Sequence, residues 1–293
     1  MQESLKIKVF VSPLVRSQLE MDVQDYKLRG LGELCNRIIA RFPELEPMRK
    51  GESSEELYKN CPPLQFYVRK ENADFLRFAQ ERNFKKGTLC RHYFEEYVNL
   101  SRGDRECFLQ RDLLQKVNAA IEAKENLFIG YRDAVLHVAP CFVAFSPSRV
   151  RAYLVVCEEA NRVSEPFRAL RISHMKSVVA DPKSEAFHLS SFALSKQAEL
   201  FREHFDPFLC YGKEVLVRLN ETGIDLLRRA VTNRPPFERV KGLDGVYRFQ
   251  CSEKLAQIYF PQFLENAEIL SPLSLREWFL TRFQKAAALY RKA

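Results

Sequence analysis

The first hundred residues repeat one order of hydrophobic and polar positions. Residues 6–11 alternate polar and apolar side chains apart from Phe10, as a half-buried strand does, and residues 64–69 alternate in the same way. Each alternating run precedes two segments whose apolar residues recur at helical spacing, and Ser12 followed by Pro13 is typical of a helix start. The pattern predicts two strand-helix-helix units in one chain.

Two such units resemble the ribbon-helix-helix fold, in which two strands pair into a ribbon laid over four helices. A single unit leaves the apolar face of its strand uncovered, so the pairing of two copies gives a physical reason for the repeat. The inward positions of the ribbon are expected to be Ile7, Val9, Val11, Leu64, Phe66 and Val68. The outward positions are expected to be Lys6, Lys8, Phe10, Gln65, Tyr67 and Arg69.

The outer face of this ribbon is a candidate contact with nucleic acid. Its basic and amide groups suit base edges in a major groove, and its aromatic rings suit stacking on unpaired bases. The alternative is a ribbon that only dimerises or docks against another domain. Residues 1–100 carry 17 Lys and Arg against 15 Asp and Glu, and this near neutrality leaves the two interpretations level.

After a predicted helix from Arg111 to Lys124, the chain becomes rich in strands, which we expect at residues 127–132, 134–144, 151–157 and 166–172. Here the sequence resembles the WYL family, whose domain is a small Sm-like β-barrel. Ala152 stands where that family has the tryptophan of its name. The segments that carry the resemblance are Ile129-Gly130-Tyr131, Val138-Ala139-Pro140, Arg151-Ala152-Tyr153-Leu154 and Pro166-Phe167-Arg168-Ala169-Leu170-Arg171-Ile172.

The resemblance implies that Tyr153, Arg168 and Arg171 belong to the family's ligand or nucleic-acid site, with Arg151 and His137 as weaker additions. Guanidinium groups form bidentate bonds to phosphate, and an aromatic ring stacks on a base. The alternative is that the tyrosine packs in the barrel while both arginines pair with acids across a hairpin. The acids available for such pairs are Glu158, Glu159 and Glu165.

Beyond residue 212 strands and helices alternate again, with strands at residues 215–219 and 246–250 and a last helix that reaches Tyr290. This resembles the α+β extension of ferredoxin-like type that follows many WYL domains. The expected fold class is therefore α+β, with three domains. They are a tandem ribbon-helix-helix-like domain at residues 1–100, a WYL domain with its preceding helix at 105–205 and the extension at 212–293.

Composition narrows the class of protein. No stretch approaches the about 20 apolar residues of a membrane span, and the charged start lacks the apolar core of a signal peptide, so we expect a cytoplasmic protein without membrane contact. The eight cysteines include no C-x-x-C pair, so no metal and no cofactor are expected. The formal charge of +8 favours a polyanionic partner.

No phosphate-binding loop, dinucleotide fingerprint, zinc-protease motif or nucleophile elbow occurs in the sequence, so we expect no enzyme. A ribbon-helix-helix-like repeat before a WYL-like region resembles the WYL accessory proteins of type VI-D CRISPR systems. Those proteins bind single-stranded RNA and stimulate the RNA-guided CRISPR effector ribonuclease, and the resemblance implies the same partners here for an expected homodimer.

Two other functions stay open at the level of sequence. The first is a transcriptional repressor whose ribbon binds duplex DNA and whose WYL barrel senses a nucleotide-like ligand. The second is a protein-interaction scaffold with incidental basicity. A preference for single-stranded RNA over duplex DNA, or the absence of any nucleic-acid binding, would discriminate among the three.

Overall fold

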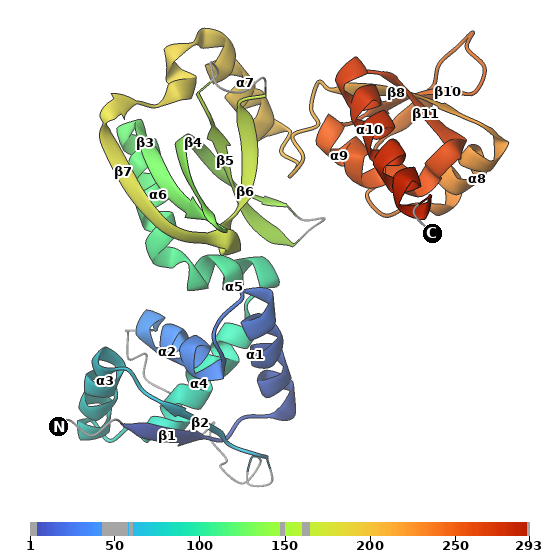
Figure 1. The fold of residues 1–293 in the computed structure, drawn as a ribbon. Coiled ribbons are helices and arrows are strands. Elements are labelled where there is room, and N and C mark those ends of the chain that lie inside the picture. The colour runs from blue at the N-terminus through green and yellow to red at the C-terminus, as the bar shows by residue number, and fades with distance from the viewer. Residues whose placement is uncertain (1–4, 43–57, 59–60, 147–149, 160–164, 292–293) are drawn as a thin grey trace.

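The computed structural model describes residues 5–42, 58, 61–146, 150–159 and 165–291. Helices and antiparallel sheets alternate along the chain, which confirms the α+β class. Figure 1 shows the two-stranded ribbon with its helices, the five-stranded sheet and the C-terminal sheet in separate parts of the molecule. Each part encloses buried side chains of its own.

The two N-terminal strands pair as the alternation predicts. Strand β1 (Lys6–Val9) lies antiparallel to β2 (Leu64–Tyr67), with Lys6 opposite Tyr67 and Lys8 opposite Gln65. All six residues expected on the inner face are buried, and they pack against the helices of both units. Those helices are α1 (Pro13–Asp25), α2 (Leu31–Arg41), α3 (Lys70–Glu81) and α4 (Lys86–Asn99).

Local chemistry fixes both units to the ribbon. The Ser12 hydroxyl accepts a hydrogen bond from the Val15 N–H and so caps α1, as expected. Gly32 in α2 and Gly87 in α4 let these two helices lie close to the strands. A side chain at Gly32 would lie 3.5 Å from Phe66 Cβ, and one at Gly87 would lie 3.3 Å from the Lys8 carbonyl oxygen.

Two short helices, α5 (Arg102–Leu109) and α6 (Arg111–Ala123), lead from the N-terminal part into a sheet of order β6-β5-β4-β3-β7. Figure 1 shows α5 between the N-terminal helices and this sheet. Helix α5 and strand β7 were not predicted. The strands are β3 (Glu125–Tyr131), β4 (Ala134–Ser146), β5 (Arg151–Cys157), β6 (Phe167–Arg171) and β7 (Met175–Glu185).

The closed barrel implied by the WYL resemblance is not found in the described residues. Strand β4 pairs with β3 through residues 134–138 and with β5 through residues 139–146, with a register shift between Pro140 and Phe142. A bulge of this kind bends a sheet, but β6 and β7 remain its two edges without a ladder between them. The sheet is therefore open.

One side of this sheet packs against α6, and the other packs against α7 (Phe192–Glu203). The first core contains Leu154 and Leu170, and the second contains Val155 and Phe167. Successive residues of β5 and β6 thus face opposite sides, as strand geometry requires. This alternation decides which of the predicted site residues lie together.

The helices and strands of the C-terminal part follow the order β-α-β-β-α-β-α, and its sheet has the order β11-β8-β10-β9. The expected strands at residues 215–219 and 246–250 are both present, and the short edge strand β9 was not predicted. Its elements are β8 (Glu214–Leu219), α8 (Glu221–Arg229), β9 (Phe237–Arg239), β10 (Val246–Gln250), α9 (Glu253–Tyr259), β11 (Ala267–Ser271) and α10 (Leu273–Tyr290). Within the described residues, every helix is too short or too polar to cross a lipid bilayer.

Candidate nucleic-acid interface

The outer face of the ribbon carries the basic and aromatic residues that the sequence placed there. Lys6, Lys8, Gln65, Tyr67 and Arg69 are all exposed. The Tyr67 side chain is 62% exposed, and the Lys6 ammonium lies 5.8 Å from the centre of its ring. The ribbon thus presents a ring flanked by cations to solvent.

These cations have no acidic partner in the part of the chain that the structure describes. Lys6, Lys8 and Arg69 form no ion pair there, although the described part of the chain contains many carboxylates. A phosphate that approaches them displaces water and counterions, so binding breaks no ion pair among the described residues. The near-neutral charge of residues 1–100 therefore hides a local basic surface.

A buried pair of amides holds this surface in place. The Asn36 side chain donates to the Tyr67 carbonyl oxygen at 2.9 Å and accepts from the Arg69 N–H at 2.8 Å. Asn72 in turn donates to the Asn36 carbonyl oxygen at 2.8 Å. Because both amides are buried, these bonds are shielded from water and fix the end of β2 that carries the ring and the guanidinium.

The central site residues are only partly brought together. Tyr153 on β5 lies directly opposite Arg171 on β6, and Arg151 lies two positions before Tyr153, so these three share one face. Arg168 lies three positions before Arg171 and points to the other face. His137 lies on β4, where its ring stacks on Phe128 at 4.4 Å between ring centres.

Each central cation meets a carboxylate, in contrast to those of the ribbon. Arg168 pairs with Glu158 across the β5–β6 hairpin, as the alternative interpretation expected. Three further pairs join the remaining candidates to acids. They are Arg151 with Asp25 at 3.4 Å, Arg171 with Glu106 at 3.5 Å and His137 with Asp181 at 3.1 Å.

Glu106 on α5 is the most deeply placed of these acids and is fully buried. Its carboxylate accepts the N–H of Ala152 at 3.1 Å and the N–H of Ser173 at 3.0 Å. Ala152 lies on β5 and Ser173 lies in the 3-10 turn Ile172–His174 between β6 and β7, whereas Glu106 comes from the helix that follows the N-terminal part. This carboxylate therefore joins the helices below the ribbon to the central sheet.

A second buried acid extends the connection. The Asp22 carboxylate on α1 accepts from Tyr97 Oη at 2.7 Å and from Arg105 Nε at 2.8 Å.

Burial, followed by the charge of Asp22, raises the pKa of both Tyr26 and Tyr97 well above the ordinary tyrosine value. Burial, followed by the charges of Arg171, Arg132 and Lys27, lowers the pKa of His174. The junction around Asp22 and Glu106, where the N-terminal helices meet the central sheet, thus favours neutral tyrosines and a neutral histidine.

Some donors near this junction remain unused. Among the described residues, Arg151 Nη1, Arg171 Nη2 and Ser173 Oγ are buried and have no hydrogen-bond partner. Arg151 is 7% exposed, so water reaches it poorly. Guanidinium and hydroxyl donors left in this state suit the oxygens of a small anion.

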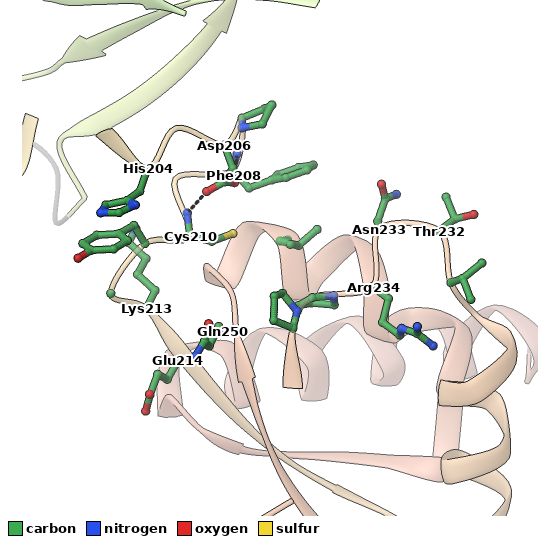
Figure 2. Close-up of a pocket in the computed structure, with 17 residues that line it drawn as sticks. His204, Asp206, Phe208, Cys210, Lys213, Glu214, Thr232, Asn233, Arg234 and Gln250 are labelled. Carbon is green, nitrogen blue, oxygen red and sulfur yellow. Dashed lines mark hydrogen bonds between the residues drawn. The ribbon is translucent and has the colours of Figure 1, made fainter. Parts of the chain in front are cut away.

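A cavity of about 970 Å³ lies elsewhere, between residues 204–214 and the loop 231–236. Figure 2 shows His204, Lys213 and Gln250 on one side of it and Thr232, Asn233 and Arg234 on the other. None of the residues predicted as site residues lines it. Sequence patterns gave no signal for this cavity, because its lining combines two irregular segments with Gln250 on β10 and Leu255 on α9.

Comparison with known proteins adds a shared fold. No protein-family model matches the chain, and no curated protein matches it. A solved structure described as a CRISPR Cas-related protein is similar over 100% of this chain and 95% of its own, with 14% identical residues and a TM-score of 0.63. The alignment with proteasome accessory factor B/C of Arthrobacter aurescens covers 60% of this chain and 27% of that protein, with 18% identical residues. Its TM-score of 0.25 is too low to show a shared fold. The chain therefore shares its fold with a CRISPR Cas-related protein.

Proposed function

We propose that this chain is a non-enzymatic accessory protein of a CRISPR system that binds single-stranded RNA through the outer face of its ribbon. In this proposal the chain modulates an RNA-guided ribonuclease by stimulating its activity. The observation that carries the proposal is the set of exposed cations, Lys6, Lys8 and Arg69, which have no acidic partner among the described residues and flank an exposed tyrosine.

Each component of this surface suits one component of an unpaired strand. Lysine and arginine bind phosphates and release counterions, so they supply affinity without regard to sequence. Tyr67 offers a ring on which one base stacks, which a duplex does not allow because its bases are already stacked. Gln65 adds an amide that bonds to base edges. The combination favours single strands.

The shared fold supports the cellular setting of the proposal. The similar structure is described as a CRISPR Cas-related protein, and the likeness extends over the whole of this chain. The fold alone leaves the ligand open, so the assignment of RNA comes from the chemistry of the ribbon.

Fluorescence anisotropy tests the proposal. The full chain is titrated into labelled single-stranded RNA, single-stranded DNA and duplex DNA of equal length, each at 50 and at about 200 mM salt. We expect the tightest binding to single-stranded RNA and a loss of affinity with salt. Tighter binding to duplex DNA, or binding to none of the three, would contradict the proposal.

The unused donors at the junction favour a second candidate function. A repressor whose ribbon binds duplex DNA and whose central sheet senses a small anion would use Arg151 Nη1, Arg171 Nη2 and Ser173 Oγ to hold that anion. A two-stranded ribbon also fits a major groove. A footprint on duplex DNA that is lost in Lys8→Ala with Arg69→Ala, together with a melting temperature that phosphate raises, would favour this function.

A further inference from the structure

The cavity beside β8 is built by two irregular segments. After α7 the chain turns through residues 204–214, where the Asp206 carboxylate accepts the N–H groups of Phe208 and Cys210 at 2.8 and 2.7 Å. After α8 it turns through residues 231–236, and the Gln250 N–H donates to the Pro236 carbonyl oxygen at 2.9 Å. These bonds fix the conformation of both walls.

One wall carries a stacked pair of rings. His204 and Tyr211 lie with their ring centres 4.1 Å apart and their planes 6° from parallel. The Tyr211 side chain is 44% exposed, and the cavity around it is also lined by apolar groups. A third flat ring extends such a stack, so this wall suits a planar aromatic ligand. The apolar lining residues include Pro207, Phe208, Val231, Pro235, Pro236 and Leu255.

The charged groups of the lining already have partners. Lys213 pairs with Glu165 at 2.9 Å, and Glu214 pairs with Arg248 at 3.3 Å. Arg234 donates to the Leu227 carbonyl oxygen at 3.1 Å. Asp206 is occupied by its own turn, as described above. Lys213, Glu214 and Asp206 therefore offer little unpaired charge to a ligand, whereas Arg234 contacts a neutral carbonyl oxygen and forms no ion pair with the described residues.

Neutral polar groups remain for recognition. Within the described residues, the Gln250 amide and the Thr232 hydroxyl line the cavity without a side-chain hydrogen bond to the protein. An amide both donates and accepts, and a hydroxyl does the same. These groups match the mixed donors and acceptors on the edge of a nucleobase, whose face would lie on Tyr211.

We propose that this cavity binds a nucleobase, supplied either by a free purine nucleoside or by an unpaired base of RNA. A cavity of about 970 Å³ accommodates a base with its sugar. A purine is expected to bind more tightly than a pyrimidine because its larger face stacks better. The site goes beyond the proposed function and does not depend on it, since none of the ribbon residues lines it.

Isothermal titration calorimetry with the full chain tests the site. Adenosine is expected to bind with a Kd on the order of 0.1 mM. AMP is expected to bind at least as tightly, because Arg234 in the lining forms no ion pair with the described residues. Ribose 5-phosphate, which lacks a base, should not bind. An eight-nucleotide oligoadenylate, titrated into the Lys6→Ala with Lys8→Ala chain with and without Tyr211→Ala, distinguishes the sources. Binding at least tenfold tighter than adenosine that Tyr211→Ala removes indicates an RNA base, and binding no tighter than adenosine indicates the free nucleoside.

Two substitutions localise the binding. Tyr211→Ala removes the exposed ring and should weaken adenosine about tenfold to a hundredfold. Gln250→Leu keeps the size of the side chain and should weaken adenosine about tenfold. Tyr290→Ala, which removes an exposed tyrosine at the end of α10, is the matched control and should leave the Kd unchanged.

Adenosine binding by a ribbon variant distinguishes this site from the ribbon. Lys6→Ala with Lys8→Ala should bind adenosine as the unaltered chain does, and the adenosine Kd should be the same at 50 and about 200 mM salt. The proposal is overturned if adenosine fails to bind at millimolar concentration, or if both Tyr211→Ala and Gln250→Leu bind it normally.

Discussion

The ribbon and the central sheet both carry arginines and lysines beside a tyrosine, but the two regions use their cations differently. On the ribbon, Lys6, Lys8 and Arg69 face solvent without an acidic partner among the described residues. On the sheet, Arg168 and Arg171 each contact a glutamate. A paired cation must give up a contact before it binds a phosphate, whereas an unpaired one exchanges only counterions. The ribbon is therefore the candidate that we favour for the proposed contact with RNA, and Arg168 and Arg171 contact acids within the fold.

The largest expected effect concerns the structural role of the sheet. Glu106→Ala leaves the N–H groups of Ala152 and Ser173 buried without an acceptor and leaves Arg171 without its carboxylate. We expect the free energy of unfolding to fall by about 3–5 kcal/mol in urea denaturation. Glu96→Ala on the exposed face of α4 is the control and should change it by less than about 0.5 kcal/mol. Equal small effects would show that the junction does not depend on Glu106.

A smaller effect is expected at the ring of the ribbon. Tyr67→Ala should weaken single-stranded RNA about fivefold to a hundredfold, because stacking of one base contributes about 1–3 kcal/mol. Tyr67→Phe keeps the ring and should bind RNA as the unaltered chain does. Stability should change little in both, since the side chain is exposed. RNA affinity is measured by fluorescence anisotropy. An affinity of Tyr67→Ala equal to that of the unaltered chain would show that no base stacks on Tyr67.

The smallest expected effect is a change of stability with pH near His174, which should not accompany a change in RNA binding at the ribbon. The pKa of His174 is lowered by burial and by Arg171, Arg132 and Lys27, with Glu106 opposing them. The folded state thus prefers the neutral ring, so its contribution to stability is complete above the ordinary pKa of 6.5 and is lost as pH falls below that value. His174→Asn should flatten this part of the stability profile between pH 7 and 5. Lysines and arginines do not titrate there, so the same variant should leave the pH dependence of RNA binding unchanged.

Local sequence patterns predicted the ribbon well. Alternation over six residues determines which side chains of a strand are buried, and both strands of the ribbon show it without interruption except at Phe10. Strand β7 was missed because only Met175 and Val178 of its residues are buried and because Pro182 interrupts it. The pattern of a strand with one sparse apolar face is difficult to distinguish from a loop.

The role of the central arginines was not predictable from local patterns. Glu106 contacts residues 46 and 67 positions further along the chain, and nothing in its own helix marks it as buried. The alternation of β6 does separate Arg168 from Arg171, and the structure agrees with it. The sequence already offered Glu158 as a partner of Arg168, whereas the acids that contact Arg151 and Arg171 became visible only when the helices and the sheet were assembled.

The measurement that tests the comparison most directly is the salt dependence of single-stranded RNA affinity in matched double variants. Lys6→Ala with Lys8→Ala, Arg168→Ala with Arg171→Ala, and Arg228→Ala with Arg229→Ala on α8 each remove two positive charges from the chain. Each is measured well below its melting temperature. We expect the ribbon variant alone to lose at least about tenfold in affinity and to reduce the log–log salt slope by about 1.4. A loss confined to Arg168→Ala with Arg171→Ala would contradict the assignment and place the RNA on the central sheet.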